Sequence, residues 1–253
     1  MAIFTKRPLT HKQLIKLDDL CPEATSTYKP IKHSLVAETV KRYAEAHLGP
    51  AINESYGTSA DGLRFFGCTT FESPLSRKDD RRGPTALAIG YRSGYDKRLS
   101  LGLVSGSSVM VCENLCFAGD FRATRRHTKN VMSALSAVLA ETIRAAKAEH
   151  VRGEAFYNLL AENKLSDREF YRLMGLCLGE RALSSSQVTA ALKDWRRPRY
   201  KEFEPRDAWS AYNCANESLK ITQPEKIISS HVNLNRVFIS SFPSLWAKAC
   251  GVI

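Results

Sequence analysis

The chain has 253 residues, of which 43% are hydrophobic and 25% are charged, a composition that suits a globular protein with one substantial core. Lys and Arg number 37 against 26 Asp and Glu, so the net charge of +11 favours polyanionic partners, with a basic surface kept for solubility as the alternative. The apolar runs are far shorter than the ~20 residues of a membrane span, the start has no apolar stretch of signal-peptide length, and the seven cysteines are scattered. We therefore expect a cytoplasmic protein with no membrane partner.

The first elements in chain order are two helices. Apolar residues at helical spacing predict helices at 10–20 and 34–48. Ser34 is a possible N-cap of the second helix, and Gly49 followed by proline supplies its stop. We expect these helices to cover one end of the core.

A change of period then predicts strands. Runs at 53–58 and 63–72 are joined by Asp61-Gly62, which is a strong hairpin signal. The polar segment 73–83 is expected to be a long, exposed, net-positive loop, and a third strand is expected at 85–93.

Two more strands and the longest helix follow. Strands are predicted at 99–104 and 108–112, with Ser105-Gly106-Ser107 as the turn between them. After Gly119-Asp120, an apolar stripe of Val131, Leu135, Val138 and Leu139 predicts a helix that runs toward Glu149. The remaining predicted helices lie at 154–162, 166–178, 186–195, 206–219 and 231–242, with a capping-box candidate at the start of the second.

Strands followed by a long helix are typical of an α+β fold. We expect an antiparallel sheet of about five strands packed on the long helix, with N-terminal helices and a helical C-terminal region. The expected organisation is a core domain at 1–152 and a helical region at 153–253 that packs on it.

Two basic segments are candidate nucleic-acid contacts. Helical spacing places the cations of 122–129 on one face at a helix N-terminus, which favours phosphate binding, although a solvated polar face is the alternative. In 195–203, cations alternate with aromatic rings, as in proteins that bind single strands, or else the rings anchor a charged connector to the core. The candidate nucleic-acid-binding residues are Arg92, Lys97, Arg98, Arg122, Arg125, Arg126, His127, Lys129, Arg196, Arg197 and Arg199.

Metal and nucleophile motifs are weak in this sequence. Cys112 and Cys116 lack a second pair with zinc-finger spacing, and His127 lacks an obvious carboxylate to orient it. The phosphate-loop, dinucleotide, zinc-protease and serine-hydrolase motifs are absent from the sequence. We therefore expect no cofactor, no metal and no catalytic residue.

Residues 91–128 resemble the phage- and plasmid-associated domain-of-unknown-function family numbered 932. The resemblance rests on the stretches 90–97, 106–115 and 126–128, with a later echo at 209–216. It implies a protein of a mobile element with a role in recombination, replication or counter-defence. The order of strands and a long helix with a basic start is also similar to the core of single-strand annealing proteins, which is an analogy of topology alone.

These observations together predict a DNA-binding protein of a phage or plasmid, acting in the host-cell cytoplasm. We expect it to bind or anneal single-stranded DNA as a homo-oligomer, without covalent chemistry. Three alternatives stay open: an inhibitor that binds a host defence protein, a structural phage component, and a metal-dependent nuclease. The nuclease would use Asp96, Glu113, Asp120 or His127.

Overall fold

The computed structural model describes residues 8–75, 82, 85–109, 114–117, 123–125, 127 and 131–252. The strands are β1 (Pro8–Leu9), β2 (Ala51–Thr58), β3 (Arg64–Glu72), β4 (Thr85–Gly94), β5 (Leu101–Val109), β6 (Asn114–Phe117) and β7 (Ala123–Arg125). The α-helices are α1 (His11–Lys16), α2 (His33–Leu48), α3 (Val131–Glu162), α4 (Asp167–Gly179), α5 (Ser185–Arg196), α6 (Ala208–Ser218), α7 (Pro224–Ser241) and α8 (Pro243–Ala249). Short 3-10 turns lie at Leu17–Leu20, Lys201–Phe203 and Leu219–Ile221.

The described strands form one antiparallel sheet, and this confirms the predicted α+β class. The strand order is β1-β2-β3-β4-β5-β6, and β7 also pairs with β5. The predicted first hairpin is confirmed: β2 and β3 pair from Ala51–Phe71 to Thr58–Phe65 around a turn in which Gly62 has a φ of 72°. Strands β2 to β5 are the long strands of the sheet.

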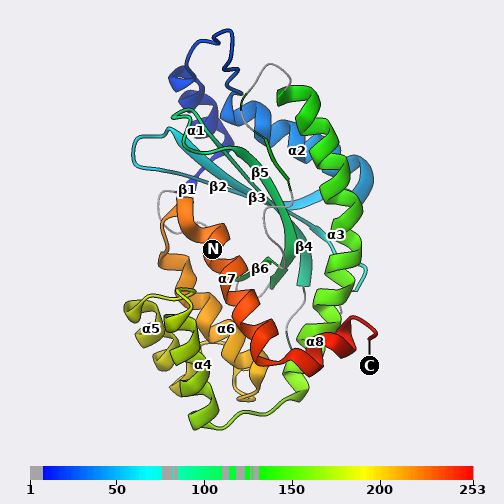
Figure 1. Cartoon of the computed structure of the whole chain (residues 1–253), viewed down its shortest axis with the longest axis vertical. Helices are drawn as coiled ribbons and strands as arrows, with labels where there is room; N and C mark the ends of the chain where they lie inside the picture. Colours follow the sequence, from blue (N-terminus) through cyan, green and yellow to red (C-terminus); the bar gives the residue numbers. More distant parts are fainter. Residues whose placement is uncertain are drawn as a thin grey trace.

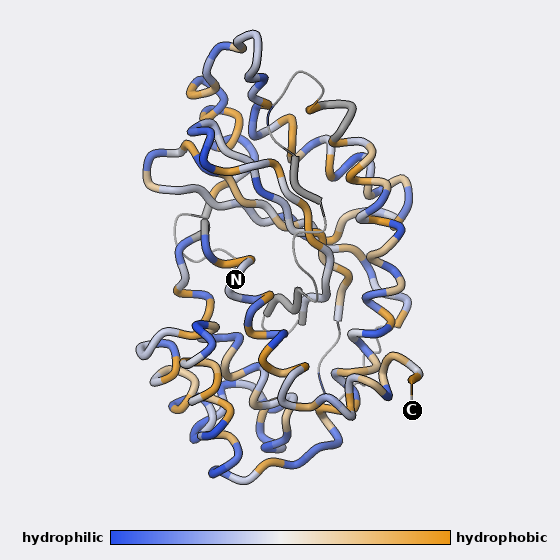
Figure 2. Tube along the Cα trace, viewed as in Figure 1, coloured by the Kyte–Doolittle hydropathy of each residue, from blue (hydrophilic) through white to orange (hydrophobic). Residues whose placement is uncertain are grey.

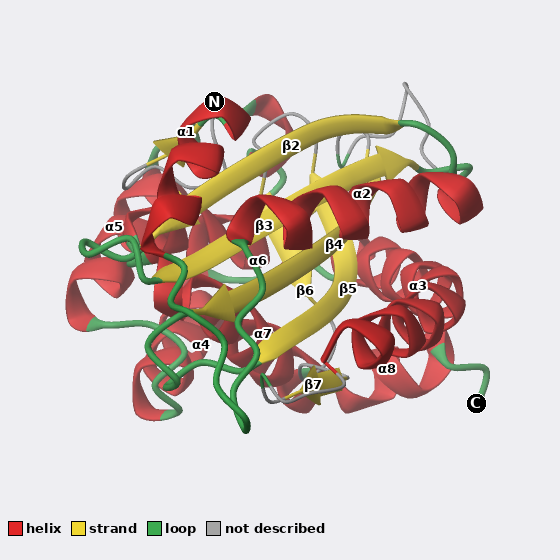
Figure 3. Cartoon of the chain, turned by 90° about the horizontal axis from the view of Figure 1, so that it is seen from above, coloured by secondary structure: helices red, strands yellow, loops and turns green. Residues whose placement is uncertain are grey.

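Helices cover both faces of this sheet, so the core has two layers of side chains (Figures 1 and 3). Side chains alternate along a strand, so Leu87, Ile89 and Tyr91 of β4 face α2 and α3, whereas Ala88 faces α7. On the α7 side, Ala88 packs with Phe66, Cys68, Val104, Ile227, Ile228 and Val232. Figure 2 shows apolar and polar residues interleaved along α3, which is typical of a helix with one buried face.

The C-terminal helices have a core of their own, rich in aromatic rings. Trp195 stacks on Phe170 with ring centroids 4.2 Å apart, and Trp209 stacks on Tyr212 at 5.7 Å. The second half of α3 contributes Phe156 to this cluster, whereas its first half packs on the sheet. Helix α3 therefore runs across the expected boundary at 152/153 and joins the two cores. Of the described helices, none has both the length and the apolar character that crossing a bilayer would need.

The predicted turn at residues 105–107 is wrong. These residues lie inside β5, where Gly106 pairs with Ala88 of β4. Ser105 and Ser107 are buried and hydrogen-bond to Glu149 and His150 of α3 at 2.8 and 2.7 Å. Small polar residues that are typical of a turn serve here as strand residues in contact with a helix. Of the predicted fifth strand, residues 108 and 109 belong to β5 and 110–112 lie outside the described residues.

The predicted start and end of the long helix are also wrong. Helix α3 begins at Val131, because residues 123–125 instead form β7 and pair with the edge of β5 at Leu101–Leu103. The helix then continues through Gly153 to Glu162 and includes the predicted separate helix at 154–162. One glycine costs a helix about 1 kcal/mol, which burial of the neighbouring Phe156 and Tyr157 outweighs.

Several helix starts show how well caps can be predicted. Ser166 forms the predicted capping box with Glu169, whereas the capping box that Thr10 forms at the start of α1 was not predicted. Helix α2, in contrast, begins at His33, and the predicted cap Ser34 donates its hydroxyl to Asp18 instead. Helix α7 begins seven residues before the predicted start at 231, and α8 was not predicted; a proline in the first helical turn is the sequence signal for both.

Candidate nucleic-acid interface and a buried serine–histidine cluster

Three segments far apart in the sequence meet at one pocket, which we call the cationic pocket. They are the stretch before α2, the β4–β5 loop and the residues that follow β7. The pocket has a volume of about 620 Å³ and is lined by Thr27, Tyr28, Lys97, Arg98, Leu99, Ser100 and His127. The structure therefore brings together Lys97, Arg98 and His127, three of the residues predicted to contact nucleic acid.

Tyr28 holds these segments together. Its hydroxyl donates to the carbonyl oxygen of Tyr95 at 3.0 Å, and its ring lies 4.9 Å from the Nζ atom of Lys97. The edge of the His127 ring meets the Tyr28 ring at a centroid distance of 5.9 Å. The amide of Lys29 donates to the carbonyl oxygen of His127 at 2.9 Å, so the backbone also ties the first segment to the third.

The charge of the pocket comes from Lys97 and Arg98, whose side chains are exposed. The nearby Asp96 carboxylate accepts a hydrogen bond from Arg64 Nε at 2.7 Å and one from the backbone amide of Arg98 at 3.1 Å. Within the described part of the chain, no carboxylate pairs with Lys97 or Arg98. Lys97 has a φ of 61°, a left-handed conformation that L-residues adopt at a cost of roughly 1–2 kcal/mol. Two exposed cations without an ion pair among the described residues, one of them on a strained backbone, suit a site for anions.

His127 contributes a neutral ring rather than a charge. It is only 5% exposed, and its Nε2 atom lies 3.4 Å from the hydroxyl of Ser93. Burial lowers the pKa of His127 below its ordinary value, so the imidazole is uncharged at neutral pH. Among the described residues, its Nδ1 atom has no hydrogen-bond partner. His127 therefore lines the cationic pocket as a packed, uncharged ring.

The helical arrangement predicted for residues 122–129 is wrong where the structure describes it. Residues 123–125 form β7, and Arg125 is paired with Leu101, directly after the pocket residue Ser100. The argument from a helix N-terminus therefore does not apply to Arg125, although its backbone lies at the same end of β5 as the pocket. Arg122, Arg126 and Lys129 lie outside the described residues, as do Glu113 and Asp120.

Arg92 lies apart from the cationic pocket. It is the neighbour of Ser93 in β4, and Ser93 is the residue that contacts His127. Successive side chains of a strand point to opposite faces, so Arg92 is on the face that α7 covers. Its strand partner Phe66 belongs to the apolar cluster on that face.

The second basic segment is an anchored connector. Trp195 and Phe203 are buried, so they are core residues and not platforms for bases. Arg199 Nε donates to Asp194 at 2.8 Å, and its guanidinium lies 3.6 Å from Glu217. Arg196 and Arg197 are exposed at the end of α5. Within the described residues, Arg196 and Arg197 form no ion pair and are therefore open to solvent, unlike Arg199.

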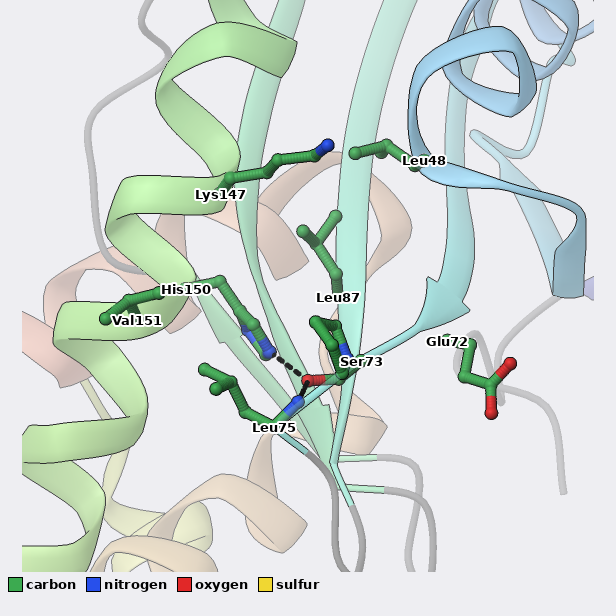
Figure 4. Close-up of a pocket in the computed structure, with 9 residues that line it drawn as sticks. Leu48, Glu72, Ser73, Leu75, Leu87, Lys147, His150 and Val151 are labelled. Atoms are coloured by element: carbon green, nitrogen blue, oxygen red, sulfur yellow. Dashed lines mark hydrogen bonds between the residues drawn. The ribbon is translucent and has the colours of Figure 1, made fainter.

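A second site, which the sequence did not indicate, lies between α3 and the sheet (Figure 4). His150 of α3 makes two hydrogen bonds: its Nε2 atom lies 2.6 Å from Ser73 Oγ and its Nδ1 atom 2.7 Å from Ser107 Oγ. All three residues are at most 4% exposed. We call them the serine–histidine cluster. Burial lowers the pKa of His150, so its ring is neutral at neutral pH.

The serine–histidine cluster borders an apolar pocket of about 530 Å³. In Figure 4, Ser73, Leu75 and His150 converge at one end of this pocket, and the side chain of Lys147 extends toward Leu48 at the other. The remaining lining residues are Glu72, Pro74, Leu87 and Val151. A mostly apolar cavity with a few convergent polar groups is typical of a small-molecule site.

Buried charges surround the serine–histidine cluster. Arg82 Nη2 donates to Glu154 of α3 at 3.1 Å, and both side chains are at most 5% exposed. The Arg82 guanidinium also lies over the ring of Trp209, 5.9 Å from its centroid. The expected exposed loop at 73–83 is therefore wrong for Ser73 and Arg82, which belong to the interior. Residues 76–81 and 83 lie outside the described residues.

The comparisons with known proteins found no relative. No family model, no curated protein and no solved structure matches the chain. Among the described residues, no three His, Cys, Asp or Glu side chains gather in a way that could hold a metal ion. Side-chain geometry is therefore the basis for choosing the candidate sites.

Proposed function

We propose that this protein binds single-stranded DNA at the cationic pocket, without covalent chemistry at that site. The observation that supports the proposal is the meeting of Lys97 and Arg98 with Tyr28 and His127, from three segments of a chain whose net charge is +11. Exposed cations that no carboxylate neutralises attract phosphates and release counterions from them.

The shape of the site favours a single strand over a duplex. A pocket of about 620 Å³ can admit a nucleotide or two of a flexible strand, whereas a rigid duplex would meet only its rim. Tyr28 is 8% exposed and already packs against Lys97, so its main role is to position the cation. We expect phosphate contacts to supply most of the affinity and base stacking to add little.

The wider setting of this function follows from the resemblance to the phage-associated family, which stays a prediction. On that basis we propose a homo-oligomeric protein of a mobile element that acts on DNA in the host-cell cytoplasm, in recombination or annealing. The exposed Arg196 and Arg197 and the segment around Arg125 are the proposed further contacts of a bound strand.

The proposal is tested by replacing Lys97 and Arg98 together with Ala and measuring fluorescence anisotropy of labelled single-stranded DNA over a range of salt concentrations. Losing two phosphate contacts should weaken binding at low salt and reduce the slope of log affinity against log salt by about 1.4, roughly 0.7 per charge. The matched control is Arg168→Ala with Arg172→Ala, which removes two exposed cations from α4, at the far end of the molecule (Figure 1). Equal slopes for both double variants would remove the cationic pocket from the proposal.

A further inference from the structure

We propose that Ser73 is a nucleophile activated by His150, and that the apolar pocket beside them binds the acyl group of a small ester. This activity is independent of DNA binding, because the two sites lie at opposite ends of β5. The cationic pocket lies next to the first residues of β5, and the serine–histidine cluster lies between α3 and its last residues. The supporting geometry is the 2.6 Å contact between Ser73 Oγ and His150 Nε2 at the wall of a cavity of about 530 Å³.

The hydrogen bonds assign the protons. The amide of Leu75 donates to Ser73 Oγ at 3.1 Å, so the hydroxyl proton of Ser73 is available to His150 Nε2. The neutral ring then carries its proton on Nδ1 and donates it to Ser107 Oγ at 2.7 Å. Ser107 thus orients the imidazole as a carboxylate does in other nucleophile–base pairs, and it does so without stabilising a positive charge as strongly.

The reaction that this arrangement can perform is ester hydrolysis in two steps. Ser73 Oγ attacks the carbonyl carbon while its proton moves to His150 Nε2, and the ester C–O bond then breaks as that proton passes to the leaving alkoxide. Water, activated by the same ring nitrogen, next cleaves the acyl–serine bond to give a carboxylic acid and restore the Ser73 hydroxyl. No oxidant or metal is required.

The lining of the pocket indicates the class of substrate. Leu48, Pro74, Leu75, Leu87 and Val151 supply apolar walls for an acyl chain or ring. Lys147 extends over the other end of the pocket, whereas the carboxylate of Glu72 points away from it (Figure 4), which favours an acyl group that carries an anion at its far end. We therefore expect the protein to prefer esters with a short or medium apolar acyl chain. A negative charge at the far end of that chain should improve the substrate further.

Covalent capture by a reactive probe is the sharpest test, because it reports the nucleophile and its base directly. It does not depend on hydrogen-bond donors for an oxyanion, and we assign none among the described residues. The full-length protein is incubated with a fluorophosphonate probe, and the labelled peptide is identified by mass spectrometry. Wild-type protein should be labelled at Ser73. Ser73→Ala should abolish the label, and His150→Gln should slow labelling on the order of 10²-fold.

Three controls keep the result interpretable. Ser105→Ala removes another buried serine of the α3-facing row of β5, one that bonds Glu149 and does not line the pocket, and should label at the wild-type rate. Ser73→Ala should keep its circular dichroism spectrum and its DNA affinity. In wild-type protein, the labelling rate should keep its neutral-pH value when the pH falls just below 6.5. The reason is that burial lowers the pKa of the His150 base from its ordinary value of 6.5. Absence of label on folded wild-type protein, or an equal label on Ser73→Ala, would overturn the assignment.

Discussion

The cationic pocket and the serine–histidine cluster are built in opposite ways. The cationic pocket lies where loops meet, presents exposed charge and keeps a neutral histidine beneath it. The serine–histidine cluster lies between a helix and a sheet, is buried, and is surrounded by paired charges. The first should therefore tolerate substitution and respond to salt, whereas changes around the second should be felt in the stability of the fold.

The largest expected effect concerns the buried charges beside the serine–histidine cluster. Arg82→Ala leaves Glu154 buried without its ion pair and should lower the free energy of unfolding by about 3–5 kcal/mol, measured by urea denaturation. Arg206→Ala is a matched control, because Arg206 also pairs with a carboxylate, Asp167, and lies over a tryptophan ring. That pair is 45% and 52% exposed, so its loss should cost about 1 kcal/mol or less. Similar losses in the two variants would show that burial does not distinguish these pairs.

A buried histidine at the start of α2 should make stability depend on pH. His33 is fully buried and stacks on Tyr95 at a centroid distance of 3.8 Å, and burial lowers its pKa to about 4. The unfolded chain takes up this proton near pH 6.5 and the folded chain only near pH 4. The contribution of His33 to the free energy of unfolding is therefore fully present above pH 6.5. It is lost as the pH falls from 6.5 to about 4, by roughly 3 kcal/mol at most.

The test of that pH dependence is His33→Phe, which keeps an aromatic ring against Tyr95 and removes the titrating group. Urea denaturation at pH 7 and pH 4.5 should show a smaller difference for the variant than for the wild type. His127 and His150 also have lowered pKa values, so part of the dependence should remain. An unchanged difference would mean that His33 is not the main source.

The smallest expected change in stability is at Lys97. Lys97→Gly removes the charge and also relieves the positive φ of 61°, so the free energy of unfolding should stay within about 1 kcal/mol of the wild type or rise slightly. Affinity for single-stranded DNA should nevertheless fall, as measured by anisotropy at low salt. A variant that loses stability and keeps its affinity would contradict the assignment of Lys97 to a binding role.

Much of the fold could be predicted from local patterns. The Asp61-Gly62 turn and the Ser166 capping box were confirmed, because a turn that needs positive φ and an orphaned helix N-terminus are local requirements that particular residues meet. Residues 105–107 and 123–125 were misread for the opposite reason. Their conformation is decided by α3 and by the open edge of β5, which are partners distant in the sequence.

The two sites also differ in how far local sequence signals indicate them. Lys97 and Arg98 could be named as candidate contacts because charge is visible in the sequence, although their meeting with Tyr28 and His127 at one pocket was not expected. Ser73 and His150 are separated by 77 residues and carry no motif, so nothing local marks them. A periodic signal does exist: apart from Thr142, the buried stripe of α3 is apolar up to residue 146, and it then becomes polar at 149, 150 and 154, opposite the serines of β5.

The most direct test of the central claim is an anisotropy titration of the wild-type protein with labelled single-stranded and duplex DNA at two salt concentrations. The account predicts tighter binding to the single strand, with an affinity that falls steeply as salt rises and with the DNA intact on a gel afterwards. Absence of binding near physiological salt, or an affinity that does not change with salt, would contradict the claim that the cationic pocket is a nucleic-acid site.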